Sequence, residues 1–125
     1  MADRLNRSFL AFPQEVRGAT PPPFVGDSRY GKFALVHINI VSIVSGGTLT
    51  VTLERIDPAS GVPSTILASA ALAAAGHTVL KVGPGLPVSG NASANDVWPV
   101  LYRIRPVQGG TAGDINYSIG VQVVG

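Results

Sequence analysis

Apolar and polar residues alternate with a period of two along several segments that follow residue 32. This period places successive side chains on opposite faces of a β-strand, so each alternating segment is expected to have one apolar face. The apolar faces predicted in this way are Ala34–Val36–Ile38–Ile40, Leu49–Val51–Leu53 and Ile115–Tyr117–Ile119–Val121–Val123.

The segments 33–44 and 48–56 are joined by Ser-Gly-Gly, which is typical of a turn. We therefore predict a β-hairpin with one face in water. The residues expected on the water face are Thr48, Thr50, Thr52 and Glu54.

The remaining segments continue this pattern. Alanines in 64–76 suit a helix, but the segment is short, lacks Glu and Lys, and follows a turn cluster, so we predict a strand of small side chains with a bend. Strands are also expected at 77–82, 100–107 and 115–124, with a long irregular stretch at 83–99. Six or seven short strands without an amphipathic helix predict an all-β fold, an antiparallel β-sandwich or jelly roll.

The first 32 residues have a different composition, with three consecutive prolines and no regular apolar repeat. We interpret 1–32 as an extended N-terminal arm and 33–125 as the sandwich domain. Aromatic residues on a Pro-rich extended backbone are expected to anchor the arm to a partner surface. The open alternative is that the arm folds over its own sandwich and supplies an edge strand. The predicted partner-contact residues are Arg4, Arg7, Phe9, Phe12, Arg17, Phe24 and Tyr30.

Charge and cysteine content narrow the function classes. Charged residues form 13% of the chain, about half of the usual share in globular domains. The surface is therefore expected to consist of small polar residues or to be covered by other protein. The net charge of +2 lies entirely in residues 1–32, which is far from a basic nucleic-acid footprint. The chain has no cysteine, which excludes disulfides and thiolate metal sites. Its start does not resemble a signal peptide, and no apolar run is long enough for a membrane span.

The candidate chemistry is weak, so we expect no enzyme, no metal and no cofactor. His37 and His77 lie 40 residues apart without carboxylates at ligand spacing, which disfavours a metal site. Ser, His and Asp occur without a nucleophile elbow, and the glycines of 83–90 lack the pattern of a phosphate loop.

Two arginines, Arg103 and Arg105, share one face of a predicted strand near Tyr102 and Trp98. Such residues could contact single-stranded nucleic acid. Tyr102 points to the opposite face, however, and the domain is neutral overall. A solvated or subunit-facing pair is therefore the favoured interpretation, and no direct nucleic-acid binding is expected.

Five motifs in one order carry a resemblance to a known group of proteins. They are T-L-T-V at 48–51, D-P-x-S-G at 57–61, L-A-S-A at 67–70, V-L-x-V-x-P-G-L at 79–86 and Y-S-[IV]-G at 117–120. The region from residue 33 to residue 125 thereby resembles small virion proteins encoded by tailed bacteriophages. The resemblance implies a β-sandwich component of the particle, either a head decoration (cement) protein or a small tail component.

The arm favours the decoration protein among these. The resemblance then implies a non-enzymatic protein on the outer surface of the capsid, made in the host bacterial cytoplasm. It would bind the major capsid protein of the phage head, span neighbouring capsid subunits and form a homo-oligomer, with a trimer favoured. One alternative is a tail or fibre component, whose receptor-binding role predicts exposed aromatics around Trp98. Another is a carbohydrate- or oligonucleotide-binding β module.

Overall fold

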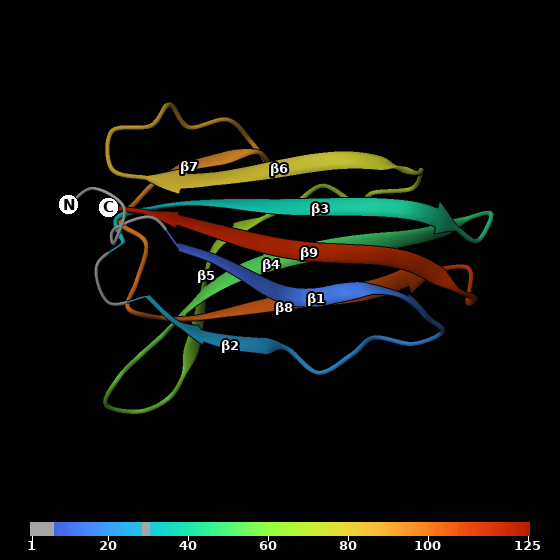
Figure 1. The fold of residues 1–125 in the computed structure, drawn as a ribbon, viewed down its shortest axis with the longest axis horizontal. Coiled ribbons are helices and arrows are strands. Elements are labelled where there is room, and N and C mark those ends of the chain that lie inside the picture. The colour runs from blue at the N-terminus through green and yellow to red at the C-terminus, as the bar shows by residue number, and fades with distance from the viewer. Residues whose placement is uncertain (1–6, 29–30) are drawn as a thin grey trace.

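The computed structural model describes residues 7–28 and 31–125, which form nine strands (Figure 1). No helix long and apolar enough to cross a membrane occurs among these residues. The strands are β1 Arg7–Arg17, β2 Phe24–Asp27, β3 Phe33–Ile43, β4 Gly47–Ile56, β5 Pro63–Ala68, β6 Gly76–Gly83, β7 Ser93–Asn95, β8 Leu101–Gly110 and β9 Ile115–Val124.

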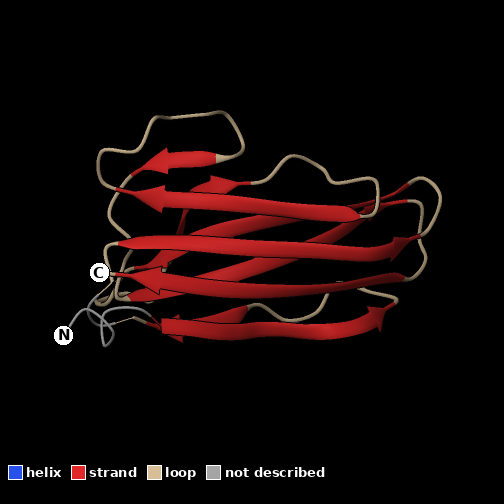
Figure 2. Ribbon diagram, turned by 45° about the horizontal axis from the view of Figure 1, so that its top comes forward, coloured by secondary structure: helices blue, strands red, loops and turns tan. Residues whose placement is uncertain are grey.

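The strands form two sheets, which we call sheet A and sheet B. Sheet A has the order β1-β9-β3-β6-β7, and sheet B has the order β2-β8-β4-β5. All neighbours are antiparallel except β6 and β7, which are parallel. The long strands of sheet A cross in front of sheet B, and loops gather at the two ends (Figures 1 and 2). The all-β sandwich prediction is confirmed.

The core lies between the sheets and follows the predicted alternation. In β9 every second residue from Ile115 is buried, and the four predicted apolar positions of β3 are also buried. Burial of these side chains is the main favourable term in folding, at about 25 cal/mol for each Å² removed from water. The central strands are therefore held by many buried side chains along their length.

The predicted hairpin between β3 and β4 is wrong, because the two strands lie in opposite sheets. The turn that follows β3 carries the chain across the sandwich, and Gly46 adopts a φ of 80° within it. Alternation specifies which face of a strand is buried, but it does not specify the neighbouring strand. Thr52 and Glu54 are also buried instead of solvated, because they lie opposite Arg105 and Arg103 of β8, whose long side chains share this face.

The alanine-rich segment contains a strand, as predicted, but only over its first part. After β5 the chain leaves the ladder, and Leu72 returns to make an isolated antiparallel bridge with Leu49. The stretch expected to be irregular contains the short strand β7, whose pairing with β6 covers that edge of sheet A.

The N-terminal segment forms one edge strand in each sheet. β1 pairs with β9 from Arg7 opposite Val123 to Arg17 opposite Ile115, and β2 pairs with β8. The three prolines at 21–23 lie between these strands, where the chain passes from one sheet to the other. The described part of 1–32 is thus built into the sandwich, as in the alternative interpretation, and no separate arm extends from residues 7–28.

Candidate partner-binding surface

The predicted contact residues do not share one environment. Arg4 and Tyr30 lie outside the described residues. Arg7 begins β1, where its backbone is opposite Val123. The other four predicted residues lie within β1 and β2, so their packing can be followed directly.

The phenylalanines of these edge strands point toward the core. Phe12 is buried, and Phe9 and Phe24 are half-buried against the core. The Phe24 ring lies 6.4 Å from the Phe12 ring and 6.3 Å from the Tyr102 ring, measured between centroids. Tyr102 in turn lies 4.8 Å from Trp98. We call these four rings, of Phe12, Phe24, Tyr102 and Trp98, the aromatic cluster, and it attaches both edge strands to the sandwich.

Arg17 also turns inward, although a charged residue at the end of an edge strand usually faces water. Its guanidinium donates hydrogen bonds to the carbonyl oxygens of Tyr117 (2.9 Å) and Pro13 (2.7 Å). The guanidinium carbon lies 4.5 Å from the centroid of the Tyr117 ring, a cation–π contact. Burial raises the pKa of Tyr117, and the charge of Arg17 opposes that rise. Arg17 therefore fixes β1 to β9 and is not free for a partner.

Tyr102 is the most enclosed member of the aromatic cluster. Burial, followed by the nearby charge of Asp27, raises the pKa of Tyr102 to about 12. Its ring lies against the backbone of Gly26, where a Cβ atom would fall 2.3 Å from the Tyr102 ring. The close approach of β2 to β8 therefore requires a glycine at this position.

The surface presented by the edge strands is aliphatic and was missed by the sequence prediction. Leu10 and Val16 of β1 are 67% and 56% exposed, and Val25 of β2 is 58% exposed. Each belongs to the segment predicted to bind a partner, but the phenylalanines predicted as contacts face the core instead. In β2 the alternation indicates Val25, because the neighbour of the inward-facing Phe24 faces outward. In β1 the register shifts on both sides of Phe12 place Leu10 and Phe12 on opposite faces, which alternation alone does not predict.

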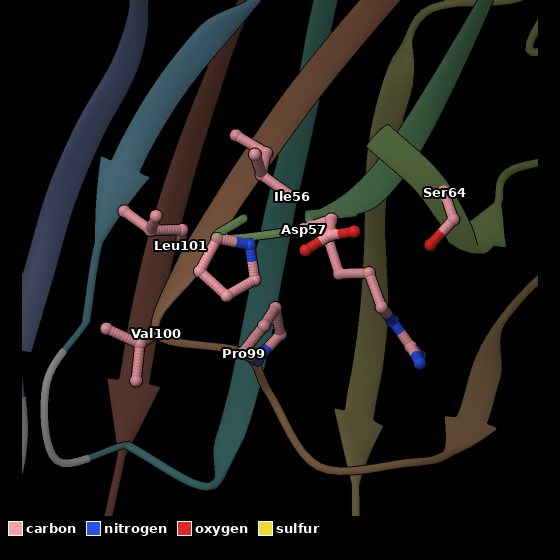
Figure 3. Close-up of a pocket in the computed structure, with 8 residues that line it drawn as sticks. Ile56, Asp57, Ser64, Pro99, Val100 and Leu101 are labelled. Carbon is pink, nitrogen blue, oxygen red and sulfur yellow. The ribbon is translucent and has the colours of Figure 1, made fainter. Parts of the chain in front are cut away.

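A groove of about 560 Å³ opens beside the start of β8 (Figure 3). Ile56 comes from the end of β4, Pro58 from the turn after it, and Pro99, Val100 and Leu101 from the segment that enters β8. The remaining lining residues are Arg55, Asp57 and Ser64.

The turn on one side of the groove is held by its own hydrogen bonds. Asp57 accepts bonds from the backbone nitrogen of Ala59 and the hydroxyl of Ser60, both 2.9 Å long. These bonds lower the pKa of Asp57, so the carboxylate stays charged. Arg55 forms an ion pair with Asp96, which ties β4 to the loop after β7. The groove is therefore pre-formed, with an apolar floor and a few polar groups at its rim, which suits an apolar side chain of another polypeptide.

The two arginines on β8 share one carboxylate within the chain. The Nε atom of Arg103 lies 2.7 Å from Glu54 Oε1, and that of Arg105 lies 3.5 Å from the same oxygen. Glu54 is only 5% exposed, because the two guanidinium groups cover it. The carboxylate offsets one of the two positive charges, and the single charge that remains is far fewer than the several phosphate contacts typical of a nucleic-acid site.

Trp98 is 1% exposed, so the exposed aromatic loop expected for a receptor-binding fibre is absent at this position. The rings of Trp98 and Tyr102 pack against each other at a tilt of 49° within the core, where they are unavailable to a nucleic-acid base or a sugar.

The two histidines meet on the outer face of sheet A. His37 Nδ1 lies 3.2 Å from His77 Nε2. The two side chains are therefore in contact in the fold, although they lie 40 residues apart in the sequence. No group of three or more His, Cys, Asp or Glu side chains capable of holding a metal ion occurs in the described part of the chain.

The fold is similar to known structures at low sequence identity. The SPBc2 prophage-derived protein YomS has a TM-score of 0.54 and 12% identity over 96% of this chain and 93% of that chain. A chain in the structure of infectious bursal disease virus Gx strain has a TM-score of 0.53 and 12% identity over 94% of this chain. The present chain spans 31% of that viral chain. No family model and no curated protein matches the sequence. At this identity the likeness establishes the fold, a sandwich that occurs in a prophage-derived protein and within a larger viral chain.

Proposed function

We propose that the protein is a non-enzymatic structural component of a bacteriophage particle, a decoration (cement) protein on the outer surface of the capsid. It binds the major capsid protein across neighbouring subunits. It does so through exposed aliphatic residues and the groove at the end of sheet B, instead of through the aromatic residues of its first 32 positions.

The observation that carries this proposal is the distribution of exposed apolar side chains. Val25 and Val100 are each more than half exposed, although the aromatic residues nearby are buried. Val100 lines the groove and comes directly before β8. Val25 lies on β2, the edge strand that pairs with β8. Pre-formed apolar surface of this kind favours a protein partner, and many copies on a shell bind together through avidity.

The fold similarities support the same class of function. A sandwich of this type occurs in a prophage-derived protein of nearly the same length and in a virus structure. The pairing of both arginines with Glu54 and the burial of Trp98 do not favour the nucleic-acid and receptor-binding alternatives.

The proposal is tested by the binding of the full chain to purified expanded capsids and to tails of the phage that encodes it. The informative variant is Val100→Asp, which places a charge in the groove without removing core volume. Val88→Asp is the matched control, because Val88 is 75% exposed in the loop after β6. A truncated chain that begins at residue 32 is unsuitable, since it lacks both edge strands.

We expect saturable binding to capsids, weakened about tenfold or more by Val100→Asp and unchanged by Val88→Asp. Unfolding curves of the two variants should match the wild type. Binding of the protein to tails and not to capsids would contradict the decoration role and support a role in the tail. Absence of binding to both particles would overturn the proposal.

A further inference from the structure

The histidine pair on sheet A is fixed by the register of two neighbouring strands. β3 and β6 are antiparallel, with His37 opposite Val79 and Asn39 opposite His77. His37 and His77 are therefore diagonal neighbours on one face of the sheet, within reach of each other's side chains. Their ring centroids are 5.3 Å apart, and the two facing nitrogen atoms are separated by 3.2 Å.

This separation is close to the distance between two imidazole nitrogens on one tetrahedral metal ion. Zinc–nitrogen bonds of about 2.0–2.1 Å at a tetrahedral angle place the two nitrogens roughly 3.3–3.4 Å apart. We propose that His37 and His77 form a two-ligand site for a divalent transition-metal ion such as Zn²⁺.

The facing atoms can supply the required lone pairs after a single tautomer change. Without metal, one ring nitrogen donates its N–H to the lone pair of the other. With metal, both nitrogens turn a lone pair toward the ion, and the displaced proton moves to the second nitrogen of the same ring. Both imidazoles stay neutral, which is the form that binds metal. Imidazole ligands select zinc, copper or nickel over magnesium or calcium.

The surroundings leave room for the ion and its other ligands. Gly120 is opposite His37 on β9, so no side chain from that position crowds the ring on this side. Asn39 is opposite His77 and is exposed, so the polar surface continues around the pair. The charged residue farther along this face of β6 is Lys81. Because the described residues offer only two ligands of the usual kind, water completes the coordination in the isolated protein.

The test is titration of untagged, chelator-treated protein with Zn²⁺. Calorimetry measures the binding, and NMR monitors the signals of the imidazole nitrogens. His37→Gln and His77→Gln each remove one ligand and retain a polar side chain. Gln122→Ala is the matched control, since Gln122 also lies on the outer face of sheet A, opposite Leu35. Thermal unfolding without metal verifies that each variant is folded.

We expect one zinc ion per chain, with the nitrogen signals of both rings shifting together. Each histidine variant should bind about tenfold more weakly or worse, because loss of even an outer-shell partner costs roughly 10–100-fold. The control should bind like the wild type. Absence of saturable binding would overturn the proposal, as would equal affinity in either histidine variant. This result is independent of capsid binding.

Discussion

The edge strands β1 and β2 and the central strands β3 and β9 are held in the sandwich in different ways. In β9 every second side chain is buried, and in β3 most of the inward positions are fully buried aliphatics. The edge strands instead depend on a few large groups, namely Phe12, Phe24 and the guanidinium of Arg17. The aliphatic residues between those groups face outward.

This difference shows how one segment can both complete a core and present a surface. Burial in the central strands is spread over many positions, so each side chain contributes a modest part of the stability. Burial in the edge strands is concentrated in the aromatic cluster, which leaves Leu10, Val16 and Val25 exposed. The edge strands should therefore respond sharply to changes in the cluster and weakly to changes elsewhere.

The largest effect is expected for Phe12→Ala. Loss of a buried phenylalanine leaves a cavity, and the free energy of unfolding should fall by about 3–5 kcal/mol. Urea denaturation measures this change, with Leu10→Ala as the control on the same strand, where the change should remain within about 0.5 kcal/mol. A loss of under about 1 kcal/mol for Phe12→Ala would mean that β1 is undocked in solution and free for a partner.

The second effect concerns alkaline pH and Tyr102. Its pKa is about 12 in the folded protein and about 10 in the unfolded chain. The raised pKa contributes stability that is fully present below pH 10, and this stability is lost as the pH rises through 12. The two-unit difference corresponds to roughly 2–3 kcal/mol.

Urea denaturation between pH 9 and 12 measures that loss, and Tyr102→Phe identifies its source. The Tyr102 hydroxyl is buried without a hydrogen-bond partner among the described residues, so the phenylalanine variant should remain folded at neutral pH. Its stability should fall less steeply with pH than that of the wild type. Parallel curves for the two proteins would contradict the enclosed position of Tyr102.

The smallest of the three effects is expected for Gly26→Ala. The added Cβ would lie 2.3 Å from the Tyr102 ring, so β2 or the ring must shift, at a cost of about 1–3 kcal/mol. The matched control is Gly120→Ala, whose Cβ would meet its nearest atom at an ordinary 3.8 Å. Equal stabilities of the two alanine variants would show that β2 does not pack closely on β8.

The strand pattern was predictable because period-two alternation follows directly from burial of one face. The buried apolar positions of β4 and β9 were identified in this way, but the burial of Thr52 and Glu54 was not. The sheet assignment was not predictable, because alternation gives the same pattern whether β4 pairs with β3 or faces it across the core. Burial of Glu54 depends on Arg103 and Arg105, which come from a strand about 50 residues later.

The sequence indicated different residues for the candidate surface from those that the fold exposes. The first 32 positions do carry exposed apolar side chains, yet aromatic size indicated Phe12, which is buried, and Phe24, which is half-buried against the core. The histidine pair could not be predicted from spacing, since it depends on the register between β3 and β6. The groove likewise combines the turn after β4 with the segment before β8.

The pairing of β1 with β9 has a consequence for synthesis of the chain. Arg7 is opposite Val123, so β1 has no ladder partner until β9 has left the ribosome. At about 5–20 residues per second, translation of the intervening chain takes several seconds, far longer than a hairpin needs to form. During that interval the β9 of the same chain is not yet available, so β1 can pair only with the completed β9 of another copy. Local protein concentration at the time of synthesis thus governs whether the first strand is kept or exchanged.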